Sequence, residues 1–250
     1  MGQLEGKVAL VTGAGSGFGE GIVKLYAREG AQVIVADINE GGANRVAADI
    51  GSSALAIKGD VSKREDIQNM VDAGLKEFGS LDIVVNNAAI THKNQPMLDV
   101  DEEMFDRMFA VNVKSIYHMT QAVVPVMRKQ GKGVIINIGS TAGIRPRPGL
   151  TWYNATKGAV NLLSKSMAIE LGPDNIRVNA ICPVMGVTGM FELFMGLPDT
   201  PENRAKFQST IPLGRFSTPN DVAAAALFLA SDAAEFITGV EFPVDGGRTI

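Results

Sequence analysis

Short, strongly apolar runs alternate with longer helix-like segments along this whole chain of 250 residues. Two of the runs, residues 8–11 and 134–136, consist only of aliphatic side chains. Such runs are typical of strands that are covered on both faces of a parallel sheet. Strands that alternate with helices form right-handed βαβ units, in which a helix crosses over to the next parallel strand. The pattern therefore predicts an α/β protein.

We expect one domain, residues 1–250, with a doubly wound, Rossmann-like fold. It should contain a mostly parallel sheet of seven strands with helices on both faces. The expected strands are residues 7–12, 32–36, 54–58, 82–85, 133–138, 176–180 and 240–243. The expected helices include residues 17–29, 40–49, 63–78, 101–129, 153–171 and 220–229. The least regular stretch is residues 183–219, and within it residues 184–216 are predicted to form a lid over the site.

Composition excludes several classes of protein. The net charge is −4 and no long basic run is present, which argues against a nucleic-acid binder. The one cysteine, Cys182, excludes an internal disulfide and a Cys-based zinc cluster, and we predict no metal site. No N-terminal signal pattern and no apolar run long enough to cross a bilayer are evident. We expect a cytoplasmic protein with neither membrane nor nucleic-acid partners.

A glycine-rich turn follows the first expected strand. The sequence from Thr12 to Gly19 reads Thr-Gly-Ala-Gly-Ser-Gly-Phe-Gly, and a helix should follow. Glycines let the backbone turn tightly and approach a pyrophosphate closely. The helix N-terminus adds free N–H groups and a partial positive charge. The turn therefore predicts a dinucleotide site.

Asp37 ends the second expected strand, 18 residues after Gly19. A carboxylate at this place can accept both adenosine ribose hydroxyls and repels a 2′-phosphate. The next residue is Ile38, and Ser16 in the glycine turn is not basic, so both also favour NAD over NADP. The alternative is that Asp37 caps the helix beginning near Glu40.

Tyr153 and Lys157 lie four residues apart at the start of an expected helix, so they share one helix face. A phenol ionises near pH 10, and a nearby cation favours its phenolate. Tyr153 would then be a usable general acid or base near neutral pH. By itself this spacing also fits an ordinary amphipathic helix.

Taken together, these motifs resemble those of the short-chain dehydrogenases/reductases, over nearly the whole chain. The glycine pattern matches residues 12–19, and Asp-Val after the third strand matches Asp60 and Val61. The Asn-Asn-Ala-Gly motif appears as residues 86–89, with Ala89 in place of its glycine. The four catalytic residues of the family match Asn112, Ser140, Tyr153 and Lys157.

The resemblance implies a role for each matched residue. Ser140 would hold the substrate oxygen, while Tyr153, activated by Lys157, would exchange a proton with it. Lys157 would also bind the nicotinamide ribose, and Asn112 would hold a water that links Lys157 to solvent. The implied cofactor contacts are Gly13, Ser16, Gly17, Phe18, Gly19, Asp37, Ile38, Asp60, Val61, Asn87, Ala88, Ala89, Tyr153, Lys157, Pro183, Gly186 and Thr188.

One departure from the family pattern follows the sixth strand. The family has Pro-Gly, an apolar residue and then Thr, whereas residues 183–188 read Pro-Val-Met-Gly-Val-Thr. Val184 thus replaces the usual glycine, and Gly186 takes the usual apolar place. Because backbone groups make the contacts there, cofactor binding should persist, but the path of the loop is open.

Candidate substrate residues lie in two loops that should border the pocket. They are Lys93 in the first loop and Arg145 and Arg147 in the second, with Trp152 next to Tyr153. Arginine suits carboxylate or phosphate recognition through bidentate hydrogen bonds, so the substrate is expected to be anionic. The alternative is that both arginines are solvated or contact another subunit.

We therefore expect an NAD-dependent oxidoreductase that interconverts a secondary alcohol and a ketone. The alternatives are NADPH-linked reduction of a 3-oxoacyl thioester on an acyl carrier protein, a sugar or hydroxy-acid dehydrogenase, and a catalytically silent dinucleotide-binding regulator. The expected helices 101–129 and 153–171 carry more apolar residues than one sheet face covers, Met108, Ile116 and Val160 among them. This pattern and the resemblance predict a homotetramer.

Overall fold

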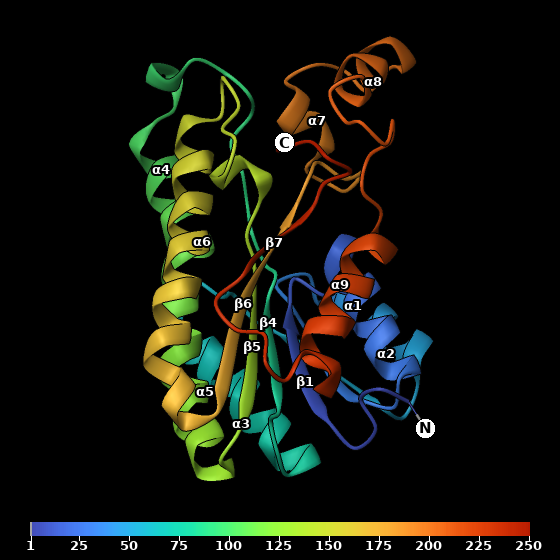
Figure 1. Cartoon of the computed structure of the whole chain (residues 1–250), viewed down its shortest axis with the longest axis vertical. Helices are drawn as coiled ribbons and strands as arrows, with labels where there is room; N and C mark the ends of the chain where they lie inside the picture. The colour runs from blue at the N-terminus through green and yellow to red at the C-terminus, as the bar shows by residue number, and fades with distance from the viewer. Residues whose placement is uncertain (1) are drawn as a thin grey trace.

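The computed structural model describes residues 2–250 as one α/β domain around a seven-stranded parallel sheet (Figure 1). The strand order is β3-β2-β1-β4-β5-β6-β7. The strands are β1 (Val8–Thr12), β2 (Gln32–Asp37), β3 (Ala54–Lys58), β4 (Ile83–Asn86), β5 (Gly133–Ile138), β6 (Ile176–Pro183) and β7 (Glu241–Val244). The predicted fold is confirmed, with strand ends that differ by a few residues at most.

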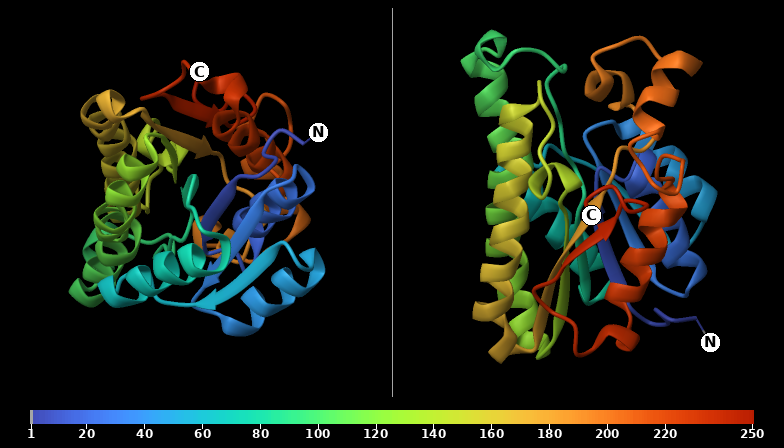
Figure 2. Two further views of the ribbon diagram at one scale, coloured as in Figure 1. Left: turned by 90° about the horizontal axis from the view of Figure 1, so that it is seen from below. Right: turned by 45° about the horizontal axis from the view of Figure 1, so that its top comes forward.

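The helices form one layer on each face of the sheet (Figure 2). The longer ones are α1 (Gly17–Arg28), α2 (Glu40–Ile50), α3 (Arg64–Phe78), α4 (Glu102–Phe109), α5 (Ser115–Gln130), α6 (Thr151–Leu171) and α9 (Pro219–Ala230). Helices α1, α2 and α9 pack in one hydrophobic core, and α3, α5 and α6 pack in the other. A hydrogen bond of 2.9 Å from the Tyr26 hydroxyl to the Ala226 carbonyl joins α1 to α9.

The apolar run of β1 supplies both cores at once. Val8 and Leu10 lie in the core beneath α3 and α5, whereas Ala9 and Val11 lie in the core beneath α1 and α9. Successive side chains of a strand point to opposite faces, so a strand covered on both sides must be apolar throughout. This is why the run shows no alternation in the sequence.

Residues 101–129 do not form the one regular α-helix that we expected. Helix α4 begins at the cap residue Asp101, whose Oδ1 accepts a hydrogen bond of 2.7 Å from the Met104 N–H. A π-helical segment, Ala110–Lys114, then separates α4 from α5. Such wide turns often occur at functional sites, and this one carries Asn112. Apolar periodicity does not distinguish a π segment from an α-helix.

The stretch that the sequence left irregular contains two short helices, α7 (Phe191–Met195) and α8 (Pro201–Gln208). The Oγ1 of Thr200 caps α8 by accepting a hydrogen bond of 3.2 Å from the Asn203 N–H, and Pro201 occupies the first turn. A separate small core holds the segment together: Val184, Met185, Phe191, Met195, Ile211 and Phe216. Helix α8 has no buried face, which explains why the sequence shows no helical period there.

Both short helices stand beyond the carboxyl ends of the strands, at the top of the molecule in Figure 1. The order of the strands reverses between β1 and β4, and ligands of open α/β sheets bind at that edge and that point. Among residues 2–250, no helix is long and apolar enough to cross a membrane.

Candidate active site

A cavity of about 410 Å³ opens along the carboxyl edge of the sheet. It runs from the end of β2, at Asp37 and Ile38, past the glycine turn, to Ser140, Tyr153 and Lys157. Its volume lies in the range of small-molecule and cofactor sites. Most of the predicted cofactor residues line it: Gly13, Ser16, Gly17, Phe18, Asp37, Ile38, Asp60, Val61, Asn87, Ala88, Ala89, Tyr153, Lys157, Pro183, Gly186 and Thr188.

The glycine turn is held flat against the loop that follows β4. Gly13 has a φ of 63°, and a Cβ on it would lie 2.9 Å from the Ala88 Cα. The Asn87 Nδ2 donates to the carbonyls of Thr12 and Gly13 at 2.8 and 3.0 Å. Gly13 therefore has both a conformational and a steric reason to be glycine.

The N-terminus of α1 faces the cavity with no side chain capping it. Ser16 is the N-cap residue, and its hydroxyl makes no capping hydrogen bond among the residues that the structure describes. Gly17 and Phe18 follow at the cavity wall, while Gly19 packs behind them, where a Cβ would lie 2.3 Å from the Gly13 carbonyl oxygen. Free N–H groups and the helix dipole suit a phosphate, so this wall fits a dinucleotide.

The Asp37 carboxylate is fixed in place at the far end of the cavity. Its Oδ2 accepts from the Gly15 N–H and its Oδ1 from the Asn39 N–H, both at 2.8 Å. The alternative that Asp37 caps α2 is wrong, because Asn39 is the N-cap residue and accepts from the Gly42 N–H at 3.1 Å. The Ile38 side chain is 58% exposed beside Asp37.

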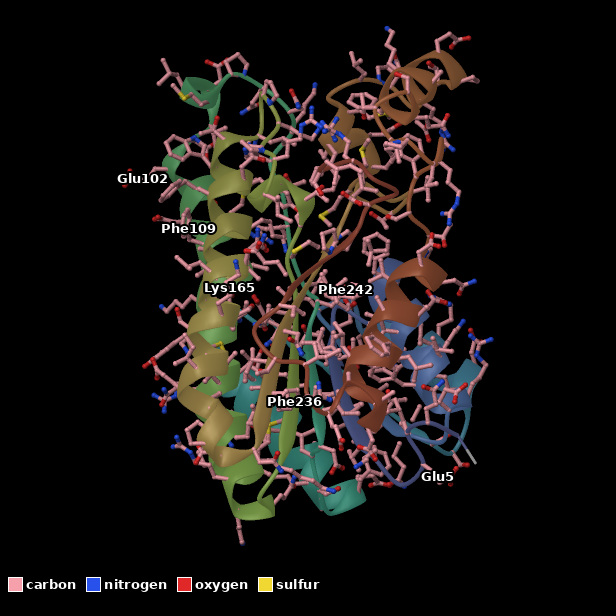
Figure 3. The ribbon with its side chains drawn as sticks, in the orientation of Figure 1. Glu5, Glu102, Phe109, Lys165, Phe236 and Phe242 are labelled. Carbon is pink, nitrogen blue, oxygen red and sulfur yellow. The ribbon has the colours of Figure 1, made fainter. Side chains whose placement is uncertain are left out.

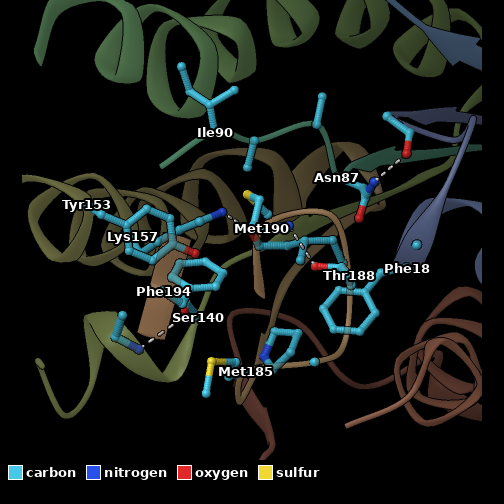
Figure 4. A pocket seen from close by; sticks show the side chains of 18 of the residues that line it. Phe18, Asn87, Ile90, Ser140, Tyr153, Lys157, Met185, Thr188, Met190 and Phe194 are labelled. Carbon is cyan, nitrogen blue, oxygen red and sulfur yellow. Dashed lines mark hydrogen bonds between the residues drawn. The ribbon is translucent and has the colours of Figure 1, made fainter. Parts of the chain in front are cut away.

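Three polar side chains meet at the inner end of the cavity: Ser140, Tyr153 and Lys157 (Figure 4). Ser140 follows β5, and its Oγ accepts a hydrogen bond of 3.0 Å from the Ala142 N–H. The Lys157 Nζ donates to the Ile138 carbonyl at 2.7 Å and lies 5.9 Å from the centre of the Tyr153 ring. Tyr153 and Lys157 are both almost fully buried in the protein.

Burial controls the proton equilibria of this group. It lowers the pKa of Lys157 to about 8, because the ammonium loses its water. Burial also raises the pKa of Tyr153 above its ordinary value, while hydrogen bonding with Ser140 lowers it. We expected the ammonium of Lys157 to lower the pKa of Tyr153, but burial raises that pKa, and Lys157 is not among the groups that shift it.

Asn112 lies next to the site but does not line the cavity. Its Nδ2 donates to the Ile90 carbonyl at 2.9 Å and to the Thr156 Oγ1 at 3.0 Å, and its Oδ1 accepts from the Ile90 N–H at 2.9 Å. The amide thus joins the π-helical segment to the loop after β4 and to α6. Both of its N–H donors are used in these contacts.

The loop after β6 follows a defined path despite its unusual sequence. The Val184 N–H donates to the Val244 carbonyl at 3.1 Å, and the Val184 carbonyl accepts from the Ser217 Oγ at 2.9 Å. Gly186 lies against the Phe18 ring, and a Cβ on Gly186 would approach the Phe18 Cζ to 2.5 Å. Phe18 therefore occupies the space that a side chain at position 186 would need.

The structure brings only two of the four candidate substrate residues to the cavity. Arg145 and Arg147 line it. Lys93 is exposed outside the lining, and Trp152 turns toward α4 and the short 3-10 helix before it, Met97–Asp99, where its Nε1 donates to the Met97 carbonyl at 3.0 Å. Trp152 also packs edge-on against Phe105, with ring centres 5.4 Å apart. Lys93 and Trp152 were therefore placed wrongly from their sequence neighbours alone.

Sequence reasoning also missed residues that do line the cavity, above all Arg107, Phe194 and Arg248. Phe194 comes from α7, and its ring packs edge-on against Tyr153 with centres 5.1 Å apart. Arg248 follows β7, so it lies at the carboxyl edge where ligands bind, a signal that was available. No sequence signal marks Arg107 on α4.

Comparisons with known proteins agree with this geometry. The family model described as enoyl-(acyl carrier protein) reductase matches residues 13–249. The 4-formylbenzenesulfonate dehydrogenase of Comamonas testosteroni is 50% identical, over 99% of this chain and 100% of that protein. A cyclopentanol dehydrogenase of the same species is 40% identical, over 100% and 99% of the two chains. A crystal structure of a Brucella melitensis 3-ketoacyl-(acyl-carrier-protein) reductase complexed with NADH is 49% identical, with a TM-score of 0.94, over 99% and 100%.

These similarities extend over nearly the full length of the chain, and the fold and cavity agree with them. The prediction of an enzyme is confirmed, as is that of a nicotinamide dinucleotide cofactor. The protein is an oxidoreductase that interconverts an alcohol and a ketone, and its chain belongs to the short-chain dehydrogenases/reductases.

Proposed function

We propose that the protein is an NAD-dependent dehydrogenase in which Tyr153 is the general acid and base. One observation carries this proposal. Ser140, Tyr153 and Lys157 meet at one end of a cavity whose other end is the fixed carboxylate of Asp37. A nicotinamide dinucleotide, when bound along that cavity, supplies the site that accepts or donates the hydride.

Ser140, Tyr153 and Lys157 each have a separate role in the reaction. The Ser140 hydroxyl hydrogen-bonds the substrate oxygen and holds it beside the phenol. During ketone reduction the Tyr153 hydroxyl gives its proton to that oxygen, and during alcohol oxidation the phenolate takes it back. Lys157, 5.9 Å from the ring centre, supplies positive charge that favours the phenolate when it forms.

Asn112 acts in this scheme as a positioning residue. Its contacts with Ile90 and Thr156 hold α6 in place, and α6 carries Tyr153 and Lys157. The expected water on Asn112 would have to be held by the free lone pair of its Oδ1, since both N–H donors are taken. A proton relay from Lys157 to solvent through that water remains part of the proposal.

The preference for NAD rests on the charges near the Asp37 end of the cavity. Asp37 repels a 2′-phosphate, and the exposed Ile38 offers it no cation. The guanidinium of Arg45, which reaches the glycine turn, donates to the Gly15 carbonyl at 3.0 Å and pairs with Glu20 at 2.7 Å. Arg45 is therefore already neutralised.

The test is the ratio of kcat/KM with NAD to kcat/KM with NADP. Wild type should favour NAD at least tenfold, and Asp37→Ala with Ile38→Arg should reverse much of that preference by removing a repulsion and adding a cation. Glu77→Gln is the matched control, because it removes an exposed carboxylate on α3 that does not line the cavity. Tighter binding of NADPH than of NADH by wild type would contradict the assignment of Asp37.

We further propose that residues 184–216 form a lid. Met185, Met190 and Phe194 line the cavity from this segment, and Phe194 touches Tyr153. The Asn94 N–H donates to the Leu193 carbonyl at 2.8 Å, so the loop after β4 anchors one end of α7. Closure of such a segment excludes water from the reaction.

The substrate of this proposal is a small alcohol or ketone with an anionic group. Support comes from the relative that is 50% identical, because its name specifies an aromatic aldehyde with a sulfonate. Reduction of a 3-oxoacyl thioester is a second candidate, favoured by the 49% identity to a reductase solved with NADH. Turnover of acetoacetyl-CoA with NADH, compared with turnover of a sulfonated alcohol with NAD, separates the two.

We also propose a cytoplasmic homotetramer. The buried free thiol of Cys182 suits a reducing compartment. Met108, Ile116 and Val160 lie in the monomer core, so they do not carry the argument for assembly. The homotetramer is supported instead by an apolar outer surface along α5 and α6, where Tyr117, Leu162 and Ile169 are 59, 65 and 80% exposed. In Figure 3, α5 and α6 lie at the left of the molecule, where Phe109 and Lys165 are labelled.

A further inference from the structure

Four arginines line the cavity without a carboxylate partner. Arg107, Arg145, Arg147 and Arg248 reach it from α4, from the loop after β5 and from the segment after β7. Across residues 2–250, none of the four forms an ion pair, whereas Arg45, Arg128, Arg204 and Arg215 each do. All four arginines that line the cavity are thus without a carboxylate partner among the described residues, and none of the paired arginines lines it.

Arg147 is the most enclosed of these side chains. Its guanidinium carbon lies 4.7 Å from the centre of the Phe207 ring, and its Nη1 lies 3.8 Å from the Met185 sulfur. Burial lowers the pKa of Arg147, and the charge of Arg248 adds to this effect. No oxygen of the described residues accepts a hydrogen bond from the guanidinium. The Phe207 ring and the Met185 sulfur hold the guanidinium plane of Arg147, and most of its five N–H donors have no partner.

The segment after β7 adds a second guanidinium to the same wall. The Arg145 Nη1 donates to the Arg248 carbonyl at 2.9 Å, which fixes the backbone of Arg248. The one nearby carboxylate, Asp245, accepts from the Gly247 N–H, the Thr249 N–H and the Thr249 Oγ1. Asp245 is therefore held by the C-terminal turn and forms no ion pair with Arg248, although its charge opposes the burial that lowers the pKa of Arg248 and offsets part of the positive charge on this wall.

We propose that Arg147 and Arg248 form a subsite for the oxyanion of the substrate. Planar guanidinium groups bind sulfonate or carboxylate oxygens through paired hydrogen bonds, and partial burial strengthens such bonds. Apolar side chains contact both ends of this region: Phe194 packs against Tyr153, whereas Met185 and Phe207 contact Arg147. The substrate class is therefore an alcohol whose apolar or aromatic body separates the reacting carbon from a terminal sulfonate or carboxylate. This inference rests on the proposed function and adds the residues that select the substrate.

The test compares two secondary alcohols of nearly equal shape: 4-(1-hydroxyethyl)benzenesulfonate and its neutral sulfonamide, each oxidised with NAD and followed at 340 nm. For wild type, KM for the sulfonate should be at least tenfold lower. Arg147→Gln should raise that KM about tenfold or more, with kcat less affected, because the anion lies away from the reacting carbon. Arg248→Gln should act in the same direction.

The neutral sulfonamide supplies the internal control. Its kcat/KM should stay within about twofold in both variants, since a neutral group forms no ion pair with a guanidinium that the substitution could remove. Arg147→Lys should recover part of the sulfonate affinity by restoring the charge without the planar fork. Lys93→Gln removes a cation outside the cavity and should leave both substrates unchanged. NADH binding and thermal unfolding of each variant establish that it is folded.

The outcomes separate this inference from the proposed function. Equal losses for sulfonate and sulfonamide, or no loss in either arginine variant, would overturn the subsite while leaving the dehydrogenase assignment intact. Oxidation of cyclopentanol but of neither aromatic substrate would also overturn the subsite. Failure to oxidise any alcohol with NAD would instead contradict the proposed function itself.

Discussion

Replacing Lys157 with methionine should stabilise the folded protein near neutral pH while it abolishes turnover. Methionine has nearly the volume of the lysine stem and carries no charge into the core. The fall in the pKa of Lys157 from 10.5 to about 8 means that folding disfavours its ammonium. Because each pKa unit is worth about 1.4 kcal/mol, the burial cost is roughly 3 kcal/mol below pH 8.

The pH dependence gives this prediction its sign. Between pH 8 and 10.5 the unfolded chain still holds the lysine proton that the folded protein has released. Unfolding then takes up protons, so the stability of wild type rises with pH through this window. Methionine has no proton to release, so the stability of Lys157→Met lacks this rise with pH. Between pH 7 and pH 10, the free energy of unfolding of wild type should therefore rise by roughly 2.5 kcal/mol relative to that of the variant.

Urea unfolding of both proteins at pH 7, 8, 9 and 10, followed by circular dichroism, measures this difference. Taking the difference between the two proteins removes the other groups that titrate in the same window, and following the change of that difference with pH removes the constant loss of the Lys157 hydrogen bond to Ile138. Lys165→Met is the matched control, because Lys165 lies on the same helix with a half-exposed side chain whose ammonium pairs with Glu241 at 3.1 Å. A difference between wild type and Lys157→Met that does not change with pH would refute the reasoning.

Three further predictions follow from the site and the surface. Tyr153→Phe should lower kcat by about 10²–10⁴-fold in a steady-state assay while NADH binding by fluorescence stays nearly unchanged, since only the proton donor is lost; near wild-type turnover would contradict the assignment. Gly186→Ala should weaken NADH binding and lower the melting temperature because its Cβ meets the Phe18 ring, and Phe18→Leu should restore both; an undisturbed single variant would contradict the packing. Light scattering at micromolar concentration should give a tetramer for wild type and a smaller species for Leu162→Glu with Ile169→Glu; a wild-type mass near 26 kDa would contradict it.

The sequence alone determined the features that depend on local composition and order. The continuous apolar runs required strands with both faces covered, and the strand–glycine turn–helix order placed the phosphate wall at Gly13–Phe18. The prediction that Asp37 faces the cofactor site came from its place at the end of β2. The spacing of Tyr153 and Lys157 singled out that pair, and the resemblance to the short-chain dehydrogenases/reductases added Ser140; the structure places all three at the inner end of the cavity.

Only the tertiary structure decided which residues from distant elements share a wall. Trp152 is next to Tyr153 in sequence, yet adjacent helix residues point in different directions, so Trp152 faces α4 while Tyr153 faces the cavity. Arg248 reaches the cavity because β7 lies beside β6 at the edge of the sheet. The pKa of Tyr153 was likewise misjudged, since burial depends on everything packed around a group, and Phe194, 41 residues along the chain, covers part of its ring.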